Sequence, residues 1–77
     1  MSLTDAPANM ILKISSIHSG SEVRKKLLAL GIHIDDNVMK VGAAKWGPVL
    51  VKNLSTDSSK LALGRGLAEK INVEYEN

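Results

Sequence analysis

Residues 37–54 of this 77-residue chain are NVMKVGAAKWGPVLVKNL, and this stretch decides the fold. Apolar residues recur at every second position in 37–44 and again in 49–54, as they do in half-buried strands. Trp46-Gly47-Pro48 favours a turn between them, so the stretch predicts a β-hairpin with Gly42 as a candidate bulge. The residues predicted to share a face are, in the first strand, Met39, Val41 and Ala43 and, in the second strand, Val49 and Val51.

The flanking segments extend this hairpin into a meander. Residues 10–18 (MILKISSIH) and 71–75 (INVEY) alternate in the same way and predict a first and a last strand. Residues 60–63 (KLAL) follow a polar turn and predict a short strand, and residues 64–70 (GRGLAEK) suffice for about two helical turns. The side chains expected to face the core from residues 10–18, 64–70 and 71–75 are Met10, Leu12, Ile14, Leu67, Ala68, Ile71, Val73 and Tyr75.

The clearest helix is predicted at residues 21–30 (SEVRKKLLAL). Ser19 and Glu22 have the spacing of a capping box, in which a hydroxyl and a carboxylate satisfy free N–H groups of the first turn. Gly31 is placed to end the helix in the left-handed conformation, with Ile32 packing back in a Schellman closure. The predicted apolar stripe consists of Val23, Leu27 and Leu30, widened by Leu28.

Five short strands, one α-helix and one short helical turn predict a mostly β protein, a small SH3-like β-barrel in a single domain spanning residues 1–77. Closure into a barrel removes the edges that a lone short sheet would expose. The absence of cysteine excludes a disulfide-stapled secreted fold. No signal-like segment or membrane span is recognisable, so we expect a cytoplasmic chain without direct membrane insertion.

Composition also limits the function. With one Trp, one Tyr and no Phe, the chain lacks a row of rings for stacking on nucleic acid, and a net charge of +2 is no phosphate-binding stripe. Arg24, Lys25 and Lys26 splay around the helix and are expected to form a solvated face. No nucleophile with a base and an orienting partner stands out, so the sequence predicts no enzyme. We expect a protein that works by contact with something larger.

His33, Asp35 and Asp36 are candidate metal ligands. An imidazole and two carboxylates lie within four residues, and mixed nitrogen and oxygen donors suit a divalent transition metal such as iron. A competent site usually takes three or four convergent ligands, and no further His or Cys lies nearby in sequence. The favoured alternative is an Asx-type turn after the helix, with His33 on its exposed flank.

Three segments carry a family resemblance: residues 24–32 (RKKLLALGI), 47–51 (GPVLV) and 61–73 (LALGRGLAEKINV). In this order and spacing they resemble the ferrous iron transport protein A family, over residues 3–73. The resemblance implies an SH3-like barrel. It also implies a small cytosolic accessory protein of prokaryotic ferrous iron uptake, which docks on the membrane iron permease and its GTP-binding domain to support Fe(II) import.

For this docking we predict an apolar groove bordered by Leu28 and Leu30 of the helix and by Trp46 and Pro48 of the hairpin tip. Trp46 has an alternative role, because in a chain without Phe an indole can instead cover the core. A free-standing metal-linked regulator, similar to the C-terminal domain of iron-dependent repressors, is the runner-up function, and a nucleic-acid-binding barrel is the third. The sequence leaves open whether the chain activates, assembles or senses, and whether it forms a homo-oligomer.

Overall fold

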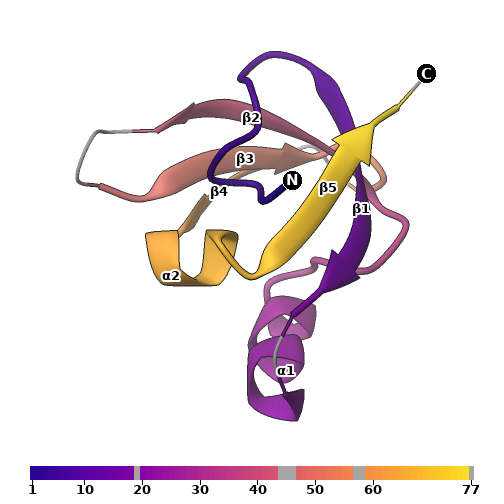
Figure 1. Cartoon of the computed structure of the whole chain (residues 1–77), viewed down its shortest axis with the longest axis vertical. Coiled ribbons are helices and arrows are strands. Elements are labelled where there is room, and N and C mark those ends of the chain that lie inside the picture. Colours follow the sequence, from indigo (N-terminus) through magenta and orange to yellow (C-terminus); the bar gives the residue numbers. More distant parts are fainter. Residues whose placement is uncertain (19, 44–46, 57–58, 77) are drawn as a thin grey trace.

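The computed structural model describes residues 1–18, 20–43, 47–56 and 59–76. Its elements are, in chain order, β1 (Ile11–Ile17), α1 (Ser21–Ala29), β2 (Asn37–Ala43), β3 (Val49–Asn53), β4 (Lys60–Leu63), α2 (Arg65–Ala68) and β5 (Ile71–Tyr75). The strands pair antiparallel in one sheet of order β4-β3-β2-β1-β5, which curls around the core (Figure 1). The predicted mostly β architecture and the hairpin of residues 37–54 are confirmed.

Two bulges determine which residues face the core. The register between β1 and β5 shifts between Ile14 and Ser16. The register between β2 and β3 shifts between Lys40 and Gly42, which confirms the predicted bulge in this strand. Each bulge changes the alternation of the strand and increases its local bend. In β1 the buried side chains are therefore Leu12, Ile14 and Ile17.

The buried residues of β2 are not those that apolar alternation groups on one face. Val38 and Lys40 are buried, with 1% and 8% of their surface exposed. The Lys40 ammonium donates hydrogen bonds to the Thr4 carbonyl at 2.7 Å and to the Ala6 carbonyl at 3.0 Å, so its burial is compensated. Apolar alternation does not identify this buried face, because it treats a lysine as a solvent-facing residue. The residues predicted to share one face of this strand are half-buried or exposed: Met39, Val41 and Ala43.

The N-terminal segment, residues 1–9, covers the free edge of β5. The Leu3 N–H donates to the Ile71 carbonyl at 2.8 Å, and Ser2 forms an isolated bridge with Asn72. Leu3 is fully buried and belongs to the core. This segment therefore pairs with a strand and protects its edge.

Both helices begin after a glycine. Gly20 is the N-cap of α1, and no side chain of the described residues caps it, so the predicted capping box is not formed by Glu22. Its other member, Ser19, lies outside the described residues. α2 begins after Gly64 and has four residues, about one turn rather than two, with Ala68 buried.

The C-terminus of α1 forms the predicted Schellman closure. Gly31 has a φ of +83°, a conformation that glycine adopts without a Cβ clash. The Gly31 N–H donates to the Leu28 carbonyl at 3.0 Å, and the Ile32 N–H donates to the Leu27 carbonyl at 2.8 Å. Leu27 and Ile32 are both fully buried, so the closure fixes the helix on the core.

Three apolar residues expected in the core lie at the surface. Met10, Leu30 and Tyr75 have exposed fractions of 45%, 43% and 51%. Met10 precedes β1 and Tyr75 ends β5, so both lie at the rim of the barrel, where the alternation of a strand no longer guarantees cover. Leu30 follows the last helical residue and is the C-cap of α1.

Candidate docking groove beside helix α1

A half-open apolar groove lies where α1 meets the end of β1. Its cavity volume is about 190 Å³. Ile17 and Ile32 form its buried floor, whereas Leu28 and Ile34 have exposed fractions of 53% and 43%. The floor belongs to the hydrophobic core, so the groove rests on well-packed residues. The side chains that line it are Ile17, Arg24, Leu28, Ile32, His33 and Ile34.

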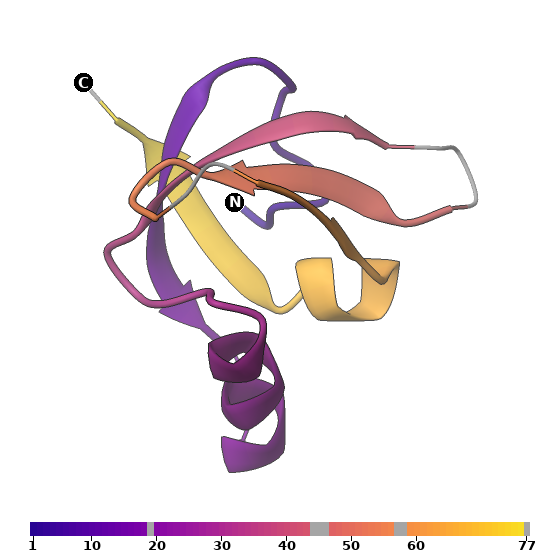
Figure 2. The same cartoon turned by 180° about the vertical axis from the view of Figure 1, so that it is seen from behind.

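Local structure explains why these side chains meet. Arg24 and Leu28 are four residues apart and therefore share one side of α1. The Schellman closure then reverses the chain, so that residues 32–34 run back beside that side of the helix. α1 itself projects below the sheet, which leaves this side open (Figures 1 and 2). The place of Arg24 in this groove could not be read from the sequence, where Arg24 belongs to a run of three cations expected to form a solvated face.

Leu28 and Leu30 do not form one border. Two residues along an α-helix are separated by about 200° around its axis. Leu28 lines the groove, whereas Leu30 is not among the lining residues. Leu27 is the residue that α1 buries completely, and Val23 packs against the core beside it. The predicted stripe of the helix is therefore narrower than the sequence suggested.

The last part of β2 and the first part of β3 lie away from α1 in both views (Figures 1 and 2). Pro48 is exposed there, just before β3. Trp46 lies outside the described residues. Pro48 is not among the residues that line the groove beside α1. Partner binding by Leu28, Leu30, Trp46 or Pro48 stays a prediction.

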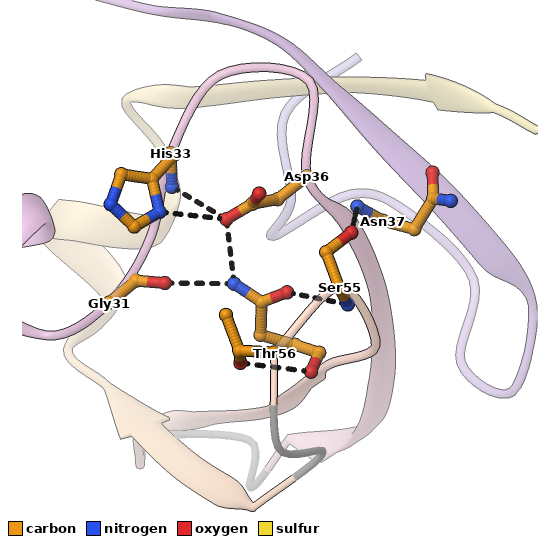
Figure 3. A network of polar contacts seen from close by, with 7 residues as sticks. Gly31, His33, Asp36, Asn37, Ser55 and Thr56 are labelled. Carbon is orange, nitrogen blue, oxygen red and sulfur yellow. Dashed lines mark hydrogen bonds and ion pairs between the residues drawn. The ribbon is translucent and has the colours of Figure 1, made fainter.

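A buried asparagine holds the turn of residues 33–36 against β3. Asn53 is 6% exposed, and its Nδ2 donates to the Gly31 carbonyl at 2.8 Å and to Asp36 Oδ2 at 2.7 Å. Its Oδ1 accepts a hydrogen bond from the Ser55 N–H at 3.0 Å. Figure 3 shows these contacts converging from the end of α1, the turn and the loop after β3. One side chain thereby connects three segments behind the groove.

Asp36 in turn fixes His33 at the edge of the groove. Its Oδ2 accepts from the His33 N–H at 2.9 Å and lies 3.1 Å from His33 Nδ1 (Figure 3). Burial raises the pKa of Asp36. The hydrogen bonds from Asn53 and from the side chain and backbone of His33, together with the charge on His33, outweigh burial and lower the pKa below its usual 3.8. The carboxylate is therefore held in its ionised form.

The three predicted metal ligands do not converge. Asp35 Oδ1 lies 3.8 Å from Lys13 Nζ, whereas Asp36 is engaged by His33 and Asn53. Within the described residues no group of three or more His, Cys, Asp or Glu side chains could hold a metal ion. The turn resembles the predicted alternative, except that the Asp36 carboxylate reaches back three residues to a backbone N–H. These side chains do not fit a metal site as they are placed, and metal binding by them stays a prediction.

Residues 1–75 match the family model of the FeoA domain. This chain belongs to the FeoA family. Its relatives include "Putative Fe(2+) transport protein A" of Methanocaldococcus jannaschii, which is 39% identical over 61 residues, 79% of this chain and 70% of that protein. FeoA proteins are accessory proteins associated with ferrous iron transport, which confirms the family predicted from the sequence.

Solved structures show the same fold. The crystal structure of an Iron Uptake Regulatory Protein (FeoA) has a TM-score of 0.84 and 20% identity, covering 95% of this chain and 93% of that one. FeoA of Stenotrophomonas maltophilia, complexed with zinc and described as an SH3 domain protein, has a TM-score of 0.66 and 20% identity, covering 96% and 89%. At these identities the likeness shows the fold alone, and it confirms the SH3-like architecture. In the described part of the chain, neither helix is long and apolar enough to cross a membrane.

Proposed function

We propose that this chain is a cytosolic accessory protein of prokaryotic ferrous iron uptake that docks on the membrane iron permease and its GTP-binding domain. The observation that carries the proposal is the FeoA match over residues 1–75, supported by the name of the archaeal relative. In this function Fe(II) is the cargo of the permease and needs no site in the accessory protein. The chain acts by binding rather than by catalysis.

The groove beside α1 supplies the docking surface. Leu28 and Ile34 expose about half of their side chains beside a buried floor. Since full burial of such a side chain contributes about 1.5–3 kcal/mol, covering the exposed half contributes about 1 kcal/mol each. Arg24 at the same groove would favour a carboxylate on the segment that enters it. A loop or peptide of the permease with aliphatic and acidic side chains fits this surface.

The test is retention of the chain by the purified intact permease in its GDP-bound and GTP-bound states. Leu28→Gln keeps helix propensity but removes an apolar contact, and we expect it to weaken binding about 5- to 10-fold. Met10→Gln is the matched control, because Met10 is 45% exposed and lies outside the groove. Leu30→Gln examines the other flank of the helix. If the wild-type chain bound neither the GDP-bound nor the GTP-bound permease, the proposal would be contradicted.

A second experiment examines the hairpin tip and the runner-up function. Trp46→Ser and Pro48→Ala should weaken retention if the tip forms a separate contact with the permease. In a deletion strain, the wild-type chain should restore iron uptake without changing the expression of iron-responsive genes. Changed expression with intact uptake would instead favour the metal-linked regulator.

A further inference from the structure

A row of side chains crosses four strands on the outer face of the sheet. Ile11 lies opposite Met39, and Met39 lies opposite Lys52. Lys52 in turn lies opposite Lys60 at the start of β4. These positions alternate with buried residues of the same strands, so the row faces away from the core. Ile11 and Lys60 are exposed, and Met39 and Lys52 are half-buried.

The two lysines of this row oppose each other, and no described residue forms an ion pair with either of them. Directly opposite residues of an antiparallel pair have Cβ atoms about 5 Å apart, and like charges there destabilise the pair. Among the described residues, the ion pairs within 4.0 Å are Lys13–Asp35 and His33–Asp36, and neither Lys52 nor Lys60 takes part. The repulsion between the two lysines therefore lowers the stability of the sheet, and no ion pair among the described residues offsets it.

Apolar side chains border the lysine pair on the same face. Leu50 and Ala62 lie opposite each other, next to Lys52 and Lys60 in the β3–β4 ladder. Leu50 is 38% exposed and Ala62 is also exposed. Met39 borders the pair on the β2 side. Among the described residues, the surface therefore combines two positive charges that no ion pair neutralises with aliphatic contacts on two sides.

We propose that this lysine face, formed by Met39, Leu50, Lys52, Lys60 and Ala62, binds an amphipathic protein segment that carries two neighbouring carboxylates beside aliphatic side chains. Charge complementarity identifies the occupant, because two carboxylates remove the repulsion between the lysines. Two cations are too few for an anionic membrane, for which clusters of about 4–8 basic residues are typical. The face lies on different strands from the α1 groove, so the proposal is independent of docking at that groove.

The binding test uses a synthetic helical peptide with glutamates four residues apart beside a stripe of leucines. We expect the peptide to shift the Met39 methyl resonance, and the double variant Lys52→Glu/Lys60→Glu to weaken binding at least 10-fold. Lys25→Glu/Lys26→Glu is the matched control, with the same charge change at exposed positions of α1, and should bind as the wild type does. No binding by the wild type, or equal weakening in both double variants, would overturn the proposal.

Two further measurements separate the proposal from its alternatives. Lys60→Glu turns the like-charged pair into an opposite-charged pair, so it should raise the melting temperature by roughly 2–5 °C while it weakens peptide binding. Lys25→Glu should show neither effect, and a melting temperature unchanged by Lys60→Glu would refute the repulsion. Binding of the wild type to phosphatidylglycerol vesicles, lost in Lys52→Glu/Lys60→Glu, would assign the face to a membrane instead.

Discussion

Replacing Asn53 by alanine should remove much of the stability of this barrel. Its buried side chain makes three hydrogen bonds, to the Gly31 carbonyl, to Asp36 Oδ2 and from the Ser55 N–H. With alanine at this position, the Gly31 carbonyl and Asp36 Oδ2 would lose their donor, and the Ser55 N–H would lose its acceptor. The end of α1, the 33–36 turn and the loop after β3 would lose their shared attachment at once.

The size of the effect follows from the kind of each bond. The two bonds to neutral backbone groups contribute about 1 kcal/mol each, and the bond to the Asp36 carboxylate contributes about 2 kcal/mol. The free energy of unfolding should therefore fall by about 4 kcal/mol. A domain of this size has a total of roughly 4–12 kcal/mol, so the loss is a large part of it. The melting temperature should fall by roughly 20 °C.

Urea unfolding followed by far-UV circular dichroism measures this difference. Asn72→Ala is the matched control, because Asn72 is half-buried and its Nδ2 donates to Ser16 Oγ at 3.2 Å, a contact near the surface. We expect the control to lose about 1 kcal/mol. A loss below about 1 kcal/mol in Asn53→Ala would refute the assignment of Asn53 as the connection between the three segments.

The pH dependence of the same difference tests the charged bond. The pKa of Asp36 is lowered in the folded chain, so its ionised form contributes stability above its unfolded pKa of about 3.8. That contribution is lost as the pH falls through the folded pKa. Because Asn53 helps to lower this pKa, the difference between wild type and Asn53→Ala should be constant near pH 6 and should shrink below about pH 4. A difference that stays the same at pH 3 would contradict the bond to an ionised carboxylate.

Three further predictions concern other parts of the chain. Lys40→Met should lower the free energy of unfolding by about 2 kcal/mol in urea titrations and speed hydrogen exchange in residues 1–9, because two buried carbonyls lose their donor. In the same urea titrations, Gly31→Ala should lower the free energy of unfolding by about 1 kcal/mol through the positive φ of Gly31, because no neighbouring atom lies within 4 Å of the added Cβ. Gly42→Ala has equal space and no positive φ, so it should lower the free energy of unfolding by less. Anaerobic calorimetric titration with Fe(II) tests the metal hypothesis: metal binding at His33, Asp35 and Asp36 should give saturable heat that is lost in His33→Ala, and absence of saturable heat in the wild type would refute it.

Much of the fold follows from local sequence pattern. Alternation at every second residue located four strands, because a strand buried on one face needs this period, and the preceding polar turn located the strand at residues 60–63. Gly31 ended the predicted helix at the right place, since its φ of +83° is a local requirement that glycine meets. Order and spacing of the motifs in residues 24–32 and 61–73 were enough to identify the FeoA family.

Tertiary structure alone decided which faces are buried and which polar groups meet. Lys40 faces the core because a segment more than thirty residues away supplies two carbonyls, and no local pattern contains that contact. Asn53 and Asp36 meet across 17 positions of the chain, and their hydrogen bond holds this carboxylate against the end of β3. The groove likewise needs Ile17 of β1 beside Arg24 and Leu28 of α1. Such long-range contacts depend on how the sheet curls and where the bulges fall, which periodicity does not encode.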